Sequence, residues 1–282
     1  MSGRTKRSKL DLLRDLLNSW SPSLIAVSGG IDSRFLSWTA VEQERRNEFI
    51  YFKGPHQDEA GKREALSWLT SLCARFHVVE FDPLAVPPLS TNPRDRCYLC
   101  KKHMFSKARE IAEKRGLRHI LDGTQADDLT GYRPGRKAAR ELGVLSPLAR
   151  TGLTKAEIRF SALEAGLSRP EQPARPCLLT RFPYGYTVTH KELGQIARGE
   201  EILRNAGIQK MRLRKQMGGE FLLQIDLREE KVWERAANQV VQSLRQEFIT
   251  IRKVVYSPGV SGFFDKEEAH GKPRLLLGPE GE

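Results

Sequence analysis

Hydrophobic and polar residues change period several times along the first half of the chain. Short apolar runs such as L-I-A-V-S (24–28) are typical of buried strands, whereas residues 8–19 place leucines at the spacing of an amphipathic helix. The same rules predict further helices at 32–46, 58–75 and 98–115, and strands at 48–52, 77–81 and 118–123. Because strand and helix alternate, we predict a doubly wound α/β fold, in which helices cover both faces of a parallel sheet.

The pattern changes beyond residue 125. The stretch T-K-A-E-I-R opens a helix with the capping-box spacing from Thr154 to Glu157, and a proline-rich loop follows at 169–177. Beyond that loop we predict helices at 190–206 and 229–246, and strands at 210–214, 220–226 and 249–256. We therefore expect a first domain at 1–168, a smaller α+β domain at 169–258 and a flexible tail at 259–282.

Composition narrows the class of protein. The chain is 39% hydrophobic and 29% charged, which is typical of a globular protein with a real core. It has no run of 18 apolar residues, and its basic start leads into an amphipathic pattern, so we expect a cytosolic protein without a membrane span. A net charge of +12 favours anionic partners such as nucleotides or RNA. Four cysteines in a reducing compartment favour metal or redox chemistry over disulfides.

The most specific motif is S-G-G-I-D-S, which lies between the first predicted strand and the following helix. Gly29 and Gly30 allow the backbone to approach a ligand, and the N–H groups at a helix start bind anions. Ser28 and Ser33 add hydroxyl groups, and Asp32 is suited to hold Mg²⁺ that bridges phosphates. The motif is not a Walker A loop, because no G-K-[S/T] follows. The alternative is an ordinary glycine turn.

The motif resembles the PP-loop ATP pyrophosphatase superfamily, whose members cleave ATP between the α- and β-phosphates and adenylate a substrate. Three further segments resemble the LarE family, and the likeness spans residues 10 to 256: L-D-G-T-Q-A-D-D-L-T-G-Y-R-P-G (121–135), G-V-L-S-P-L-A-R-T-G-L-T-K-A-E-I-R (143–159) and R-P-C-L-L-T-R-F-P-Y-G (175–185).

This resemblance implies a reaction on a small-molecule nucleotide substrate. The family activates a carboxylate of pyridinium-3,5-biscarboxylic acid mononucleotide as its acyl-adenylate and then exchanges AMP for sulfur, which leaves a thiocarboxylate. It implies ATP and Mg²⁺ as cofactors and a homo-oligomer, the family's form being a hexamer. Covalent activation is reasonable chemistry, because a carboxylate is a poor electrophile until its oxygen becomes part of a leaving group.

Cysteines carry the second half of this implied chemistry. Cys97 and Cys100 lie three positions apart near the start of a predicted helix, so their thiols share a face, and basic neighbours favour the thiolate form. With Cys177 they are candidate ligands of a 4Fe–4S cluster that leaves one iron without a protein ligand. Open alternatives are Cys177 as a sacrificial sulfur donor, a zinc site that includes His103, and a redox or buried cysteine pair. Cys73 is interpreted as a packing residue.

Arginines and carboxylates complete the candidate site. Arg212 and Arg214 alternate along a predicted strand and are expected to bind a phosphate together. By resemblance, Glu200 is a candidate acid/base or orienting group, the alternative being an exposed helix glutamate. Arg181 beside Cys177 is a candidate anion ligand.

Two further residues are candidates for the nucleotide site, and a third departs from the family pattern. Gly123 and Asp127 are candidates for binding the nucleotide, although Asp127 also suits helix capping. Gln224 stands where the family pattern has an acidic residue, which argues against a metal ligand there.

Two other functions fit part of the sequence. A tRNA thiolation enzyme would also combine a PP-loop with a three-cysteine cluster, but such enzymes usually carry an RNA-binding appendage or zinc-ribbon cysteines, and the basic residues here are spread along the chain. A non-catalytic nucleotide-binding or RNA-binding module would not need the intact S-G-G-I-D-S motif or Cys177. We therefore expect no nucleic-acid partner.

Overall fold

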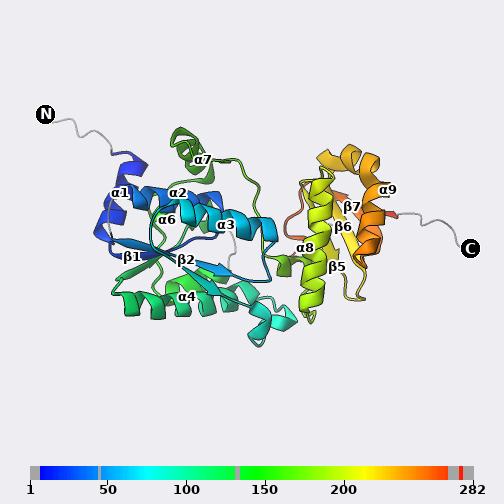
Figure 1. Cartoon of the computed structure of the whole chain (residues 1–282), viewed down its shortest axis with the longest axis horizontal. Coiled ribbons are helices and arrows are strands. Elements are labelled where there is room, and N and C mark those ends of the chain that lie inside the picture. Colours follow the sequence, from blue (N-terminus) through cyan, green and yellow to red (C-terminus); the bar gives the residue numbers. More distant parts are fainter. Residues whose placement is uncertain (1–6, 44–45, 131–133, 266–272, 276–282) are drawn as a thin grey trace, which may run out of the picture. The chain divides into compact units, whose positions relative to one another are not determined.

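The chain forms two compact units, each with its own sheet (Figure 1). The computed structural model describes residues 7–43, 46–130, 134–265 and 273–275. The first unit comprises Met1–Gly54, Glu59–Phe81 and Asp95–Arg175, and the second comprises Pro55–Asp58, Asp82–Arg94 and Pro176–Glu282.

The sheet of the first unit contains four parallel strands in the order β3-β2-β1-β4. The strands are β1 (Ser23–Ala26), β2 (Asn47–Lys53), β3 (Phe76–Glu80) and β4 (His119–Leu121). The chain moves from β1 to β2 and β3 in one direction and returns to the other side of β1 for β4. Because crossovers between parallel strands are right-handed, this reversal puts α4 on the sheet face opposite to α2 and α3. The predicted doubly wound α/β fold is confirmed.

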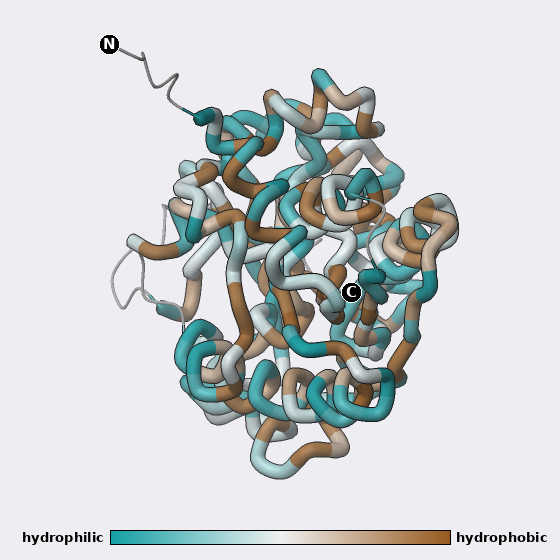
Figure 2. The backbone as a smooth tube through the Cα atoms, turned by 90° about the vertical axis from the view of Figure 1, so that its left-hand side faces the viewer, coloured by the Kyte–Doolittle hydropathy of each residue, from teal (hydrophilic) through white to brown (hydrophobic). Residues whose placement is uncertain are grey.

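Helices cover both faces of this sheet, as Figure 1 shows for α2 and α4. They are α1 (Lys9–Ser19), α2 (Ile31–Val41), α3 (Glu59–Ser71), α4 (Arg96–Arg115), α5 (Pro134–Glu141), α6 (Pro147–Arg150) and α7 (Lys155–Glu164). Successive helical residues alternate between hydrophilic and hydrophobic colours in Figure 2, as expected for helices with one buried face. The capping box at the start of α7 is present as predicted.

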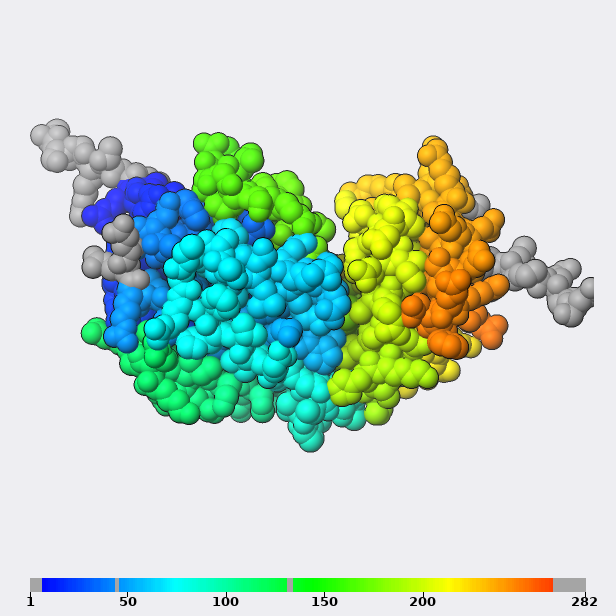
Figure 3. Space-filling view, viewed as in Figure 1, coloured from blue at the N-terminus to red at the C-terminus, as the bar shows by residue number. Residues whose placement is uncertain are grey.

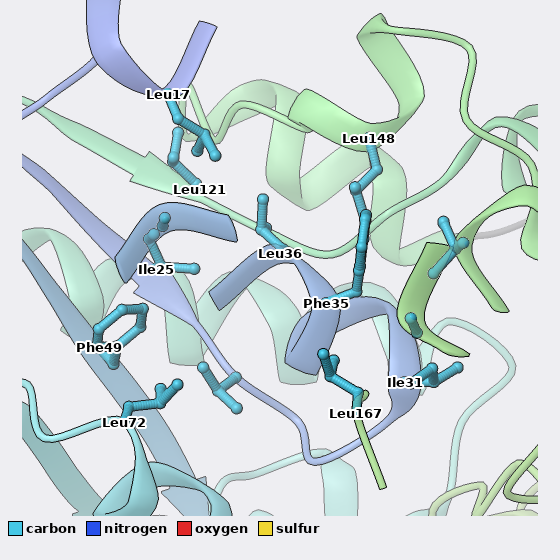
Figure 4. Close-up of a cluster of buried hydrophobic side chains, with 14 of the residues drawn as sticks. Leu17, Ile25, Ile31, Phe35, Leu36, Phe49, Leu72, Leu121, Leu148 and Leu167 are labelled. Atoms are coloured by element: carbon cyan, nitrogen blue, oxygen red, sulfur yellow. The ribbon is translucent and has the colours of Figure 1, made fainter. Parts of the chain in front are cut away.

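The core of the first unit lies around α2. Its residues Ile31, Phe35 and Leu36 are buried together with strand and helix side chains, including Ile25 and Leu148, and Figure 4 shows these side chains clustered around the α2 segment. Because α2 is buried on most of its sides, its packing fixes the position of the loop that precedes it.

The second unit is a smaller α+β fold, coloured from yellow-green to orange over most of its length in Figure 3. Its mixed sheet has the order β5-β6-β7-β8, in which only β6 and β7 are parallel. The strands are β5 (Met211–Lys215), β6 (Phe221–Asp226), β7 (Ile251–Ser257) and β8 (Pro273–Leu275), and the helices are α8 (His190–Asn205) and α9 (Glu230–Gln246). The predicted order of strand, strand, helix and strand is confirmed.

The boundaries between the units differ from the contiguous division that the sequence predicts. Residues 169–175 belong to the first unit, and 82–94 belong to the second. Residues 82–94 are held in the second unit because Asn92 donates from Nδ2 to the carbonyls of Phe182 and Pro183, at 2.9 and 2.8 Å. Such pairing between distant segments leaves no local signal in the sequence.

The predicted flexible tail is partly ordered. Residues 263–265 form a short 3₁₀ helix that contributes the buried Phe263, and β8 pairs antiparallel with β7. Residues 266–272 and 276–282 lie outside the described part. The high Gly and Pro content predicts a flexible tail. The sequence pattern does not reveal β8, because three residues are too few to show the alternation of a strand.

Candidate functional site

The S-G-G-I-D-S loop joins β1 to α2 at the point where the strand order reverses. In open α/β sheets, ligands bind outside the carboxyl ends of the strands at such a switch point. Gly29 has φ +81°, and a Cβ atom there would lie 2.9 Å from the Cβ of Ala65 in α3, so only glycine fits. Gly30 is the N-cap of α2 and provides no side-chain cap. The start of α2 is therefore suited to bind an anion.

Ser33 sets the shape of this loop. Its Oγ accepts a hydrogen bond from the N–H of Ser28 at 3.1 Å and donates to the carbonyl of Gly30 at 3.0 Å. Ser33 is buried and Ser28 is exposed. Ser33 therefore acts within the loop, whereas Ser28 is placed where a ligand can reach its hydroxyl.

Asp32 contacts a cationic side chain that the sequence analysis did not single out. Both of its carboxylate oxygens accept from Nζ of Lys155, at 2.7 and 2.8 Å, and the N–H of Lys155 donates to Oδ2 of Asp127 at 2.8 Å. Burial raises the pKa of Asp32, and the ammonium of Lys155 opposes that rise. The structure thus brings both predicted aspartates to the start of α7, where Thr154 and Glu157 had indicated only a helix cap.

A second wall of the site follows β4. A Cβ on Gly123 would lie 3.0 Å from the nitrogen of Ser33, so this glycine permits the two loops to touch. The preceding Asp122 is buried and accepts from the backbone and hydroxyl of Thr124, at 3.1 and 2.7 Å, and from the hydroxyl of Ser146, at 2.7 Å. These bonds hold the β4 loop against the start of α6.

In the second unit, Arg181 and Glu200 form a buried ion pair. Nε and Nη2 of Arg181 donate to the two oxygens of Glu200 at 2.8 and 2.9 Å. The N–H of Leu213 donates to Glu200 Oε1 at 3.1 Å. Burial alone would raise the pKa of Glu200, but Arg181 holds it below the usual value. The carboxylate therefore stays ionised and orients Arg181, and the alternative of an exposed helix glutamate is wrong.

Arg181 in turn holds the backbone around Cys177. Its Nη1 donates to the hydroxyl of Thr180 at 2.8 Å and to the carbonyls of Pro176 and Cys177 at 3.3 and 3.5 Å. The hydroxyl of Thr180 also donates to the carbonyl of Cys177 at 2.8 Å. Cys177 is half-buried at the start of the 3₁₀ helix Leu178–Arg181, and Glu200 is thus linked through Arg181 to its position.

Arg212 and Arg214 share one face of β5 but have different surroundings. Arg214 is buried and donates to Oε1 of Gln224 from Nε and Nη2, at 2.8 and 2.6 Å, to the carbonyl of Thr180 at 3.0 Å and to that of Val260 at 2.7 Å. Half-buried Arg212 donates to its own strand at the Met211 carbonyl, at 2.6 Å. Arg214 thus uses its guanidinium for hydrogen bonds within the fold, and Arg212 is the better candidate for binding an anion.

Gln224 explains the departure from the acidic pattern. Its Oε1 accepts both bonds from Arg214, while its Nε2 donates to Oγ of Ser257 at 2.8 Å. The side chain is therefore a structural hydrogen-bond partner in the sheet, and it adds no negative charge.

Positive charge exceeds negative charge in this cluster. Arg181, Arg212 and Arg214 face one buried carboxylate, Glu200, and the neutral Gln224. The carboxylates of Asp58 and Asp265 also act on Arg212 and Arg214, but from a half-buried and an exposed position. Burial, followed by repulsion from Arg181, lowers the pKa of Arg212 to about 10 and that of Arg214 to about 9, so both are protonated at neutral pH. An excess of buried positive charge favours an anionic ligand.

The four cysteines are distributed over both units, and none of them is joined in a disulfide in the described structure. Cys97 is exposed and Cys100 half-buried near the start of α4, and Sγ of Cys100 lies 3.7 Å from Sδ of Met104. Cys73 is exposed in a turn after α3 with φ +50°, so its interpretation as a packing residue is wrong, because α3 already ends at Ser71.

Metal ligation by these cysteines is not visible within the described residues. Over residues 7–43, 46–130, 134–265 and 273–275, no three His, Cys, Asp or Glu side chains are grouped as a metal site. Cys97 and Cys100 belong to the first unit and Cys177 to the second. The 4Fe–4S cluster stays a prediction.

None of the helices described is both long enough and apolar enough to cross a membrane.

Comparison with known proteins identifies relatives that cover between 64% and 86% of the chain. The family described as "Thiamine biosynthesis protein (ThiI)" matches residues 21–163, the part that carries the loop after β1. An uncharacterised protein of Synechocystis is 32% identical over 242 residues, which cover 86% of this chain and 89% of the relative. An uncharacterised protein of Methanocaldococcus jannaschii is 33% identical over 182 residues, covering 64% and 69%.

A further relative has a stated activity. The pyridinium-3,5-bisthiocarboxylic acid mononucleotide synthase of Lactiplantibacillus plantarum is 30% identical over 235 residues, which cover 80% of this chain and 84% of the synthase. The chain therefore belongs to the LarE-like family of PP-loop, ATP-using sulfur-transfer enzymes.

Proposed function

We propose that this enzyme adenylates a carboxylate of pyridinium-3,5-biscarboxylic acid mononucleotide and converts it to a thiocarboxylate. The observation that carries the proposal is the linkage of Glu200 through Arg181 to the backbone of Cys177, beside the half-buried Arg212. Such an arrangement would hold the Cys177 segment beside an excess of positive charge. The substrate, which bears a phosphate and two carboxylates, is an anion of the required kind.

The first step would take place at the loop after β1. The N–H groups at the start of α2 and the hydroxyl of Ser28 would bind the phosphates of ATP. A substrate carboxylate oxygen attacks the α-phosphorus, the bond to the β-phosphate oxygen breaks, and pyrophosphate leaves. The carboxylates of Asp32 and Asp127 are oxygen ligands of the kind that Mg²⁺ takes, and Mg²⁺ bound with ATP would compete with Lys155 for them and neutralise phosphate charge. Lys155 lies between these two carboxylates and would respond to occupancy of the site.

The second step would take place at the cysteines. A sulfur nucleophile attacks the acyl carbon, and AMP leaves with the electron pair of the broken C–O bond. Cys97, Cys100 and Cys177 fit a 4Fe–4S cluster in their chemistry, because thiols are its usual ligands and two of them share a helix face. When bound, such a cluster supplies an iron without a protein ligand, where extra sulfide can be held. Arg181 and Thr180 would keep the Cys177 backbone in place during the transfer.

One experiment separates the substrate classes. Pyrophosphate release from ATP is measured with anaerobically purified protein and either the pyridinium dicarboxylate nucleotide or bulk tRNA. We expect release with the nucleotide and none with tRNA. Release with tRNA alone would replace the proposal by tRNA thiolation.

A second experiment separates the sulfur sources. We expect the wild-type protein to be brown and to turn over many times. The Cys97→Ala and Cys100→Ala variants should lose the iron, the visible absorbance and the multiple turnover. Multiple turnover that survives in both variants would contradict the cluster, whereas a single turnover that consumes the sulfur of Cys177 would identify that residue as the donor. Sedimentation of the same preparation tests the proposed homo-oligomer, a hexamer.

A further inference from the structure

Residues 168–175 form a connector that leads from α7 to Cys177, and the first unit holds it at both ends. Nη1 of Arg169 and Nη2 of Arg175 reach the same oxygen of Glu64 in α3, at 2.6 and 2.9 Å. The two arginines are six positions apart, so one carboxylate closes the connector into a loop. A segment that is clamped in this way follows the surface to which it is clamped.

Arg34, next to the phosphate-binding motif in α2, holds the middle of the connector. It is buried, its Cζ lies 4.6 Å above the ring of Trp68, and its Nη2 donates to the carbonyl and hydroxyl of Ser168 at 2.8 and 2.9 Å. Its Nη1 donates to Oε1 of Gln172 at 3.1 Å. Because Oε1 accepts from Arg34, the amide group of Gln172 has only one orientation, and its NH₂ end faces the other way.

That NH₂ end binds the phosphate loop itself. Nε2 of Gln172 donates to the carbonyl of Gly29 at 2.9 Å. In a trans peptide the C=O and the following N–H point in opposite directions, so this bond turns the N–H of Gly30 away from the connector. Gly29 has φ +81°, and Ala65, the neighbour of Glu64, closes the space behind it. The orientation of one N–H at the start of α2 thus depends on a residue of the connector.

We propose that Gln172 is a positioning residue that couples nucleotide binding to the connector that leads to Cys177. A phosphate that binds the Gly30 N–H stabilises the Gly29 peptide in the orientation in which its carbonyl accepts the hydrogen bond from Gln172. Phosphate binding therefore favours the connector in this hydrogen-bonded position, which we call docked. By linkage, the docked connector raises nucleotide affinity by the same factor. The ligand assumed here is ATP, so this inference rests on the proposed function. It adds to that function a mutual stabilisation, in which bound nucleotide and docked connector each favour the other.

The test uses the full chain with Gln172→Met, which keeps the size of the side chain, adds no charge and removes both hydrogen bonds. Glu171→Gln is the matched control, because Glu171 lies in the same connector and its exposed side chain contacts Arg159 and not the loop. ATP affinity is measured by calorimetry, and amide exchange is followed in peptides covering 28–33 and 168–175. Thermal unfolding checks that both variants fold.

We expect Gln172→Met to weaken ATP binding about threefold to tenfold, the usual worth of a hydrogen bond, and Glu171→Gln to leave it unchanged. ATP should slow exchange at 168–175 in the wild type and the control, and lose that effect in Gln172→Met. The inference would be overturned by equal ATP affinities of Gln172→Met and the wild type. It would also be overturned if ATP did not change amide exchange at 168–175 in the wild type. A purely structural role of Gln172 would lower the unfolding temperature and leave the affinity alone.

A nucleotide-free comparison keeps the two proposals separate. Without ATP, Gln172→Met should already speed amide exchange at 28–33, because the Gly29 peptide is no longer held. If the wild type binds no ATP, the proposed function fails, and this comparison still decides whether the connector positions the loop. Unchanged exchange at 28–33 would refute that positioning.

Discussion

The guanidinium of Arg181 and the carboxylate of Glu200 meet through two parallel hydrogen bonds, 2.8 and 2.9 Å long, with both side chains almost wholly removed from solvent. Their pairing joins α8 to the segment that carries Cys177. Breaking a buried pair from one side is costly, because the remaining charge has no compensation.

Glu200→Gln should therefore destabilise the second unit by about 3–5 kcal/mol. The adjacent Glu201→Gln, at a half-buried position on the same helix, should change the free energy of unfolding by less than about 0.5 kcal/mol. Urea unfolding at neutral pH measures both variants. Equal stabilities of the two variants would show that the ion pair contributes nothing net.

Gly29→Ala should abolish ATP binding, because the added Cβ meets Ala65 at 2.9 Å in a backbone conformation that already disfavours side chains. Gly116→Ala is a matched control, since Gly116 has φ +65° and open space around its missing Cβ. The control should lose about 1–2 kcal/mol of stability and keep its ATP affinity. Calorimetric titration with ATP distinguishes the two variants, and tight binding by Gly29→Ala would argue against a role for this loop.

Asp32→Asn should lower the rate of pyrophosphate release on the order of 100-fold, as expected when a ligand around a metal–phosphate group is neutralised. Burial raises the pKa of Asp32, so its ionised form costs folding free energy at neutral pH, and the variant should unfold at an equal or higher temperature. The exposed Asp15→Asn on α1 should change neither quantity. Activity that survives in Asp32→Asn would remove this residue from the site.

Glu48 predicts a pH dependence of stability. Hydrogen bonds from Arg115, with His77 alongside, lower its pKa from 4.5 to about 2. A depressed carboxylate pKa stabilises the folded state above pH 4.5, and the contribution is lost as pH falls toward 2. Glu48→Gln should thus cost on the order of 3 kcal/mol at neutral pH and almost nothing near pH 2. A cost that does not depend on pH would indicate lost packing instead of lost charge.

The sequence by itself determined the order of most helices and strands, α5, α6 and β8 excepted, the parallel sheet and the position of the S-G-G-I-D-S loop. These features are local, because periodicity reports which side of each element is buried, and S-G-G-I-D-S occurs directly between a strand and a helix. It also singled out Cys177, Arg181 and Glu200 through a family likeness that extends over most of the chain.

Only the tertiary structure decided which of these residues act on one another. It joined Arg181 to Glu200, committed Arg214 to Gln224, placed Lys155 on Asp32 and connected Gln172 to Gly29. Each contact links positions between 10 and 143 residues apart along the chain. Side-chain charges and hydrogen bonds act over a few ångströms of space, and only the folded chain sets which distant residues come that close.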